Sequence, residues 1–156
     1  MLFSNIESPF LASDESLADF IERFERGTWP KPLWTHSAHL AVATWYLYSL
    51  PVAEATERVR DGIRSYNEAV GTRNTEDSGY HETLTLFWLG IVSDRLSRDD
   101  RPARILDAVR LVVAEFGARR DLYRDYYSFD VVKSREARAK WVPPDRSNKS
   151  MGTSAG

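Results

Sequence analysis

The chain has 156 residues, of which 42% are hydrophobic, and its 21 basic and 23 acidic residues leave a formal net charge of −2. This length suits one domain with a sizeable core, and the balanced charge gives no reason to expect nucleic acid or an anionic membrane as a partner. The absence of cysteine excludes disulfides, cysteine-based zinc sites and thiol nucleophiles. Because no signal-peptide pattern and no membrane-spanning apolar run is present, we expect a cytoplasmic protein.

The first predicted helix lies near the N-terminus. Ser13 or Asp14 is suited to cap it, apolar residues repeat at the helical period up to about Arg26, and Gly27 is suited to end it. The next stretch, Trp29-Pro30-Lys31-Pro32, predicts a stiff connector, because proline cannot occupy a helix interior.

Two further helices are predicted in the middle of the chain. Thr35 is a natural N-cap for a second helix from His36 to about Tyr48. Ser49 and Pro51 have the character of a cap and a first helical residue. A third helix therefore follows Pro51, with an apolar stripe on one face, and Gly71 ends it.

After a polar loop over residues 72–79, a fourth helix is predicted from about Tyr80 to Leu96, with His81 on its inward stripe. Pro102 is expected to open a fifth helix that ends at Gly117. Shorter helical segments are predicted over residues 119–127 and 134–140.

The chain shows no alternating strand pattern of any length. We therefore predict an all-α single-domain helical bundle over residues 1–145, with about five main helices and short C-terminal helices. Within it, residues 1–12 are expected to form an irregular arm. Residues 146–156 carry no apolar pattern and are predicted to be a disordered tail.

The three histidines of the chain are predicted to meet at one end of the bundle. Short connections make neighbouring helices antiparallel, so the second and fourth helices should run parallel and begin at the same pole. His36 and His39 are three residues apart and therefore lie side by side. His81 would approach them from the start of the fourth helix.

Such a cluster predicts a polar site. Three neutral imidazoles suit Zn²⁺, Ni²⁺, Cu²⁺ or Fe²⁺, so a divalent transition metal is the candidate cofactor, held by His36, His39 and His81. Glu82 is the candidate catalytic residue, either as a fourth ligand or as a base acting on metal-bound water. However, its side chain points about 100° round the helix from His81. Residues expected to contact a ligand are Trp34, Asn67 and Tyr80.

Other uses of the same residues stay open. Without a metal, one histidine could act as acid or base, and two helix N-termini could hold a carboxylate or phosphate. A histidine at a helix start is also often a capping residue, Glu82 would favour a helix start, and Asn67 could organise the loop. The basic excess in residues 133–149 is explained more simply by a solvated segment than by a nucleic-acid footprint.

Several short motifs carry a resemblance. They are an aromatic-Thr-His-x-x-His-Leu turn, Asn-Glu-Ala, Asn-Thr, Gly-Tyr-His-Glu-Thr, an aromatic-Ser pair and Trp-Val-x-Pro-Asp, here Trp34–Leu40, Asn67–Ala69, Asn74-Thr75, Gly79–Thr83, Tyr127-Ser128 and Trp141–Asp145. This pattern resembles a group of small uncharacterised bacterial all-α proteins, over most of residues 20–145. The resemblance implies that the two histidine turns belong together, and it supplies no reaction.

The sequence thus leads to two functional hypotheses. The first is a small-molecule or metal site at the bundle pole, including the case of a metal-dependent enzyme. The second is a non-catalytic binding or interaction module, in which the histidines fasten helix starts and an aromatic surface meets a protein partner or a second copy of the chain.

Overall fold

The computed structural model describes residues 8–146, and within that range it contains six α-helices and no strand. The helices are α2 (Asp14–Arg26), α3 (His36–Ser49), α4 (Val52–Ala69), α5 (Glu82–Leu96), α6 (Ile105–Phe116) and α7 (Arg135–Ala139). Short 3₁₀ helices cover Pro9–Leu11, Lys31–Leu33 and Leu122–Asp125. The prediction of an all-α fold is confirmed. Most of the predicted arm (1–7) and nearly all of the predicted tail (147–156) lie outside the described residues.

The predicted helix ends on α2 and α3 are present with the expected capping bonds. The Ser13 hydroxyl accepts a hydrogen bond from the Ser16 amide at 3.0 Å, and the Thr35 hydroxyl accepts one from the Ala38 amide at 3.2 Å. These bonds satisfy amides that have no partner within the helix. Gly27 ends α2 with φ of 74°, a left-handed conformation that glycine adopts without strain.

Three predicted boundaries were wrong. The helix α5 begins at Glu82, so His81 is its N-cap, with an extended backbone, although its side chain is buried. Ser49 ends α3, and Pro51 takes the N-cap position of α4. Pro102 does not open α6: its carbonyl accepts a hydrogen bond from the Tyr48 hydroxyl at 2.9 Å, and the helix starts only at Ile105.

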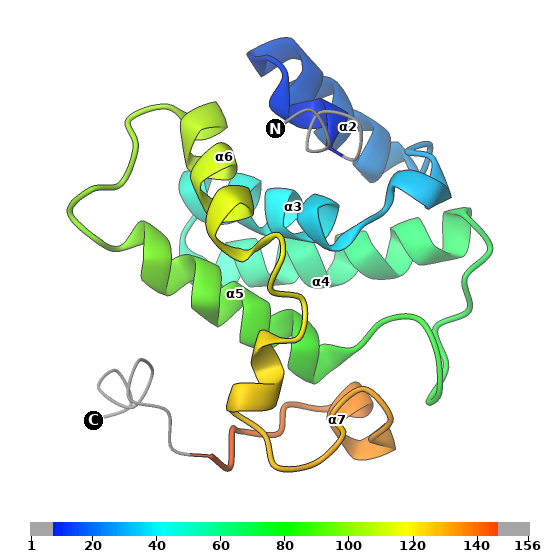
Figure 1. The fold of residues 1–156 in the computed structure, drawn as a ribbon. Coiled ribbons are helices and arrows are strands. Elements are labelled where there is room, and N and C mark those ends of the chain that lie inside the picture. Colours follow the sequence, from blue (N-terminus) through cyan, green and yellow to red (C-terminus); the bar gives the residue numbers. More distant parts are fainter. Residues whose placement is uncertain (1–7, 147–156) are drawn as a thin grey trace.

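The central helix of the fold is α3, which packs against α4, α5 and α6 (Figure 1). It is apolar on nearly all sides, as expected for a helix surrounded by others, and its buried residues are Ala38, Leu40, Ala41, Val42, Ala43, Thr44, Tyr46 and Leu47. In Figure 1, α3 and α5 run in the same direction and α4 runs against them, as predicted. The starts of α3 and α5 therefore lie at one end of the bundle.

The remaining elements cover this central group. The helix α2 packs on α4 and on the Pro9–Leu11 turn, and α7 packs on α5. No helix between residues 8 and 146 combines the length and the apolar character needed to cross a membrane.

Candidate functional site

A cavity of about 1030 Å³ lies at the end of the bundle where α3 and α5 begin. Its volume is near the upper end of the range for small-molecule sites. Six of the seven residues predicted for the site line it: Trp34, His36, His39, Asn67, Tyr80 and His81. The seventh, Glu82, does not.

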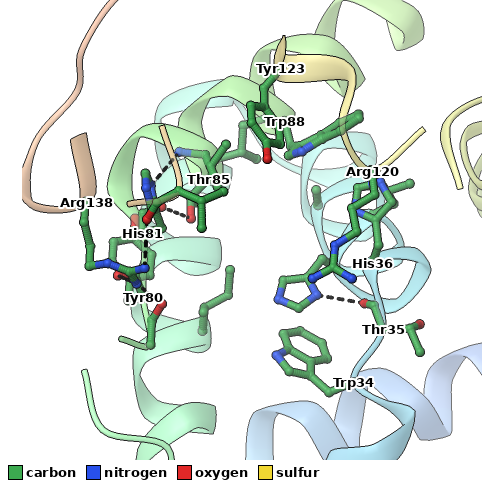
Figure 2. Close-up of a pocket in the computed structure, with 18 of the residues that line it drawn as sticks. Trp34, Thr35, His36, Tyr80, His81, Thr85, Trp88, Arg120, Tyr123 and Arg138 are labelled. Carbon is green, nitrogen blue, oxygen red and sulfur yellow. Dashed lines mark hydrogen bonds between the residues drawn. The ribbon is translucent and has the colours of Figure 1, made fainter. Parts of the chain in front are cut away.

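The cavity separates the histidines onto two walls (Figure 2). His81 lies on one side with Tyr80 and Arg138, and His36 lies on the other side with Trp34, Thr35 and Arg120. Within residues 8–146, no group of three or more histidine, aspartate or glutamate side chains is arranged to hold a metal ion. The two histidine turns line one cavity from opposite walls, and this arrangement gives no support to a three-histidine metal centre.

His81 uses both ring nitrogens to hold backbone. Its Nε2 lies 2.8 Å from the carbonyl oxygen of Val131, which can only accept, so Nε2 carries the proton. Its Nδ1 accepts a hydrogen bond from the Leu84 amide at 3.1 Å and thereby caps α5. A metal could bind this ring only if one of these bonds broke, so the geometry favours a structural role for His81.

His39 is oriented differently. Its Nδ1 donates to the carbonyl oxygen of Thr35 at 2.8 Å, which leaves Nε2 as the nitrogen with a lone pair. Nε2 has no hydrogen-bond partner within residues 8–146. Every side-chain nitrogen or oxygen atom of that range that is buried from solvent does have a partner, so Nε2 is not buried from solvent. Nε2 is therefore accessible from the cavity that His39 lines. The ring packs against Trp34, with centroids 3.9 Å apart.

His36 stands beside His39 on the first turn of α3. Its Nε2 donates to the carbonyl oxygen of Phe116 at 3.2 Å and so ties the start of α3 to the end of α6. The ring meets Trp88 edge-on, with centroids 4.6 Å apart. One nitrogen of this ring therefore fastens two helices, and Nδ1 keeps its lone pair.

All three imidazoles are neutral at neutral pH. Burial lowers the pKa of His39 from 6.5 to about 4, and the positive charge of Arg120 opposes its protonation further. Burial likewise lowers the pKa of His36 and of His81. The pKa of His39 is too low for an efficient general base near pH 7, where a matched pKa is best. Its Nε2 is better suited to accept a hydrogen bond.

Glu82, the predicted catalytic residue, is turned into an ion pair. Arg60 donates from Nε to Oε1 at 3.1 Å and from Nη2 to Oε2 at 2.7 Å, and the Tyr80 hydroxyl also donates to Oε1. Burial acts to raise the pKa of Glu82, but the hydrogen bonds from Arg60 and Tyr80 outweigh it and keep the pKa below its ordinary value. A carboxylate held in this way links α4 to α5 and does not reach the cavity.

Asn67 organises the loop at the edge of the cavity. Its Nδ2 donates to Oδ1 of Asn74 at 3.0 Å, and the same oxygen accepts the Tyr80 amide at 2.9 Å. Asn74 in turn donates to the carbonyl oxygen of Arg64 at 3.1 Å. The side chain that was predicted to contact a ligand therefore also sets the path of the loop into α5.

Sequence reasoning missed the basic side chains of the cavity, which are Arg120, Arg124, Lys133 and Arg138. Arg120 follows the end of α6, which the bond between His36 and the Phe116 carbonyl ties to the start of α3 at this pole. Lys133 and Arg138 belong to the basic excess that was interpreted as a solvated segment. They line the cavity because α7 packs on α5 and brings residues 130–138 over the pole.

Comparison of the chain with protein-family models, with curated proteins and with solved structures found no match. The resemblance to small bacterial proteins therefore remains a prediction, and the site has to be interpreted from its own geometry.

Proposed function

We propose that this protein binds a small organic molecule in the polar cavity, with His39 as the principal hydrogen-bonding contact. The observation that carries the proposal is the accessible Nε2 of His39, held in a fixed tautomer by the Thr35 carbonyl within a cavity of about 1030 Å³. Pockets with a mainly apolar lining and a few oriented polar groups are the usual form of small-molecule sites.

The rest of the lining supports the same function. The apolar floor of the cavity consists of residues that are nearly fully buried: Leu40, Ala43, Val59, Ile63 and Leu89. Trp34 and Trp88 are half-buried and add aromatic surface to the walls. An organic molecule placed here would bury its apolar surface against the floor and walls, and the removal of that surface from water favours binding.

A ligand screen tests the proposal. Fragments that raise the melting temperature of the wild type would be measured again on His39→Phe, which keeps a flat ring against Trp34 but removes the acceptor nitrogen. We expect binding of donor-bearing fragments to weaken by about tenfold, the loss of roughly one hydrogen bond. Unchanged affinity in His39→Phe, or amide chemical-shift changes only outside the cavity, would contradict the proposal.

The rival function is a non-catalytic interaction module with structural histidines. It is favoured by the bonds of His36 to Phe116 and of His81 to Val131, each of which joins segments far apart in the chain. Under this function, His39→Phe would lower stability without changing the response to any fragment. A second copy of the chain is one of the two partners expected under this function, and sedimentation of the full chain would detect it.

A metal-dependent reaction has weaker support. Only His36 and His39 keep a ring nitrogen outside hydrogen bonds, so a metal held there would need its remaining ligands from water or substrate. Elemental analysis after separate addition of Zn²⁺, Ni²⁺ and Fe²⁺ would show whether the protein retains a metal. Metal that is retained by the wild type and lost in the His36→Ala/His39→Ala double variant would support this reaction.

A further inference from the structure

The basic side chains of the cavity lack the ion pairs that many other arginines of the protein form. Eight arginines elsewhere in residues 8–146 form ion pairs with carboxylates, namely Arg23, Arg26, Arg60, Arg95, Arg98, Arg104, Arg110 and Arg135. By contrast, none of the four basic residues that line the cavity has an ion-pair partner in the same range. Six exposed arginines elsewhere in residues 8–146 also form no ion pair, so the cavity is set apart by Arg138, an unpaired cation that is half-buried.

Arg138 shows this most clearly. Its guanidinium is half-buried, and it donates to the carbonyl oxygens of Gly79 at 2.8 Å and of Val132 at 3.3 Å, with no carboxylate in hydrogen-bond contact within the described residues. The loss of water around it lowers the pKa of Arg138, and the negative charge of Asp77 offsets this shift only in part. A partly buried cation in this state gains from any anion that reaches it.

Arg120 stands on the opposite wall. Figure 2 shows its side chain beside His36, and its charge is close enough to lower the pKa of both His36 and His39. Cations thus face the cavity from both of its walls. The lining has four basic and two acidic residues, and its histidines are neutral, so the cavity carries an excess of positive charge on a chain whose net charge is −2.

The charge is separated from the apolar surface. The basic residues Arg120, Arg124 and Lys133 are exposed at the rim, whereas the aliphatic lining residues such as Leu40, Val59 and Leu89 are buried at the floor. A ligand that matches both parts has an apolar body and a negatively charged end.

We infer that the cavity binds an amphiphilic organic anion, with its apolar body on the floor between α3, α4 and α5 and its carboxylate or phosphate at the rim near Arg120. This inference rests on the proposed function, since it names the ligand class of the same cavity. His39 Nε2 would then accept a hydrogen bond from a hydroxyl or amide group on the body of the ligand, because a carboxylate has no proton to donate to it.

The test uses four probes that share a naphthalene ring: naphthoate, naphthyl phosphate, naphthalenemethanol and naphthylmethylammonium. Calorimetric titration of the full-length His39→Phe variant, in which no probe can donate to Nε2, should show that at least one anion binds about tenfold more tightly than the neutral alcohol, the expected size of a charge-assisted contact. The cation should bind most weakly. Binding of the anion should weaken as salt is added. The comparison of naphthoate with naphthyl phosphate shows which anionic group the rim prefers.

Arg120→Gln gives the matched variant, and Arg119→Gln is its control because Arg119 is the adjacent exposed arginine and does not line the cavity. We expect a loss of about tenfold in anion affinity for Arg120→Gln and no change for Arg119→Gln. Equal loss in both variants would point to general charge attraction and overturn the inference.

Different experimental results would overturn the anionic ligand class and the small-molecule site itself. If the alcohol binds as tightly as the anions or more tightly, and its affinity falls in His39→Phe, the anionic ligand class is overturned but the small-molecule site is kept. If no naphthalene probe binds, this inference is overturned, and the fragment screen on His39 judges the site separately.

Discussion

The two walls of the cavity are built from the same kind of element, the first turn of a long helix with a histidine, yet they use that histidine in opposite ways. On the α5 wall, His81 uses both ring nitrogens in hydrogen bonds to backbone: one caps its own helix and the other binds the Val131 carbonyl. On the α3 wall, the hydroxyl of Thr35 does the capping, so the ring of His39 needs only one nitrogen for the backbone.

The difference shows how a capping residue decides what its neighbours can do. Where threonine supplies the cap, a histidine four residues later keeps a nitrogen for the cavity. Where histidine must act as the cap itself, nothing remains for a ligand. Two motifs that look equivalent in sequence therefore have different capacities, and the following predictions test this contrast.

The largest expected effect is on the α5 wall. His81→Ala removes the cap of α5 and leaves the Val131 carbonyl without its donor, which should lower the free energy of unfolding by about 3 kcal/mol. Urea unfolding measures the loss. His81→Asn keeps a side-chain acceptor for the Leu84 amide and should recover about 1 kcal/mol. A loss within error for His81→Ala would refute the structural role.

The next effect is a pH dependence on the α3 wall. The unfolded His39 ring takes up a proton near its ordinary pKa of 6.5, whereas the folded ring resists protonation down to a pKa of about 4. Between these values the unfolded state binds more protons, so stability falls as pH falls. From about pH 7 to about pH 5, this ring should contribute a loss of about 2 kcal/mol.

The measurement is urea unfolding of wild type and His39→Phe at both pH values. His36 and His81, whose pKa values are also lowered, act in the same direction and remain in both proteins, so the difference in slope reports His39 alone. If the free energy of unfolding changed equally with pH in the wild type and in His39→Phe, His39 would not be buried as a neutral ring.

A smaller effect separates Glu82 from the cavity. Glu82→Gln weakens the ion pair with the partly buried Arg60 and should cost about 1 kcal/mol of stability, with no effect on ligand affinity. Glu57→Gln is the control, since Glu57 pairs with the same arginine but is mostly exposed. Lost ligand binding in Glu82→Gln, at unchanged stability, would restore Glu82 as a site residue.

The smallest effect is expected at the outer edge of the α5 wall. Arg135 and Asp77 pair between α7 and the loop before α5, with Nε and Oδ1 2.8 Å apart, but both side chains are largely exposed. Arg135→Gln should therefore change the free energy of unfolding by less than about 0.5 kcal/mol. A loss above about 2 kcal/mol would show that this ion pair, rather than His81, fastens the wall.

Local features of the fold were predictable from the sequence, and the reason is physical. The Thr35 cap and the Gly27 stop act on backbone within a few residues, so the pattern contains both partners. The parallel course of α3 and α5 followed from short connections alone.

The chemistry of the site was less predictable, because its partners are far apart in the chain. His81 meets a carbonyl 50 residues later, and Glu82 meets an arginine 22 residues earlier on another helix. No spacing rule joins such pairs. The same holds for Arg120 and Arg138, which share a cavity only because the segment before α7 folds back over the bundle pole.

The burial of α3 decides where this protein can be redesigned. Two small residues, Ala38 and Ala41, are fully buried and do not line the cavity, so a larger side chain there would force the helices that pack against α3 apart. The side chains of Arg120 and Lys133 are exposed and bear no such constraint. Selectivity for a new ligand is therefore best engineered by exchanging rim residues, with the back of the pocket kept as a constant scaffold.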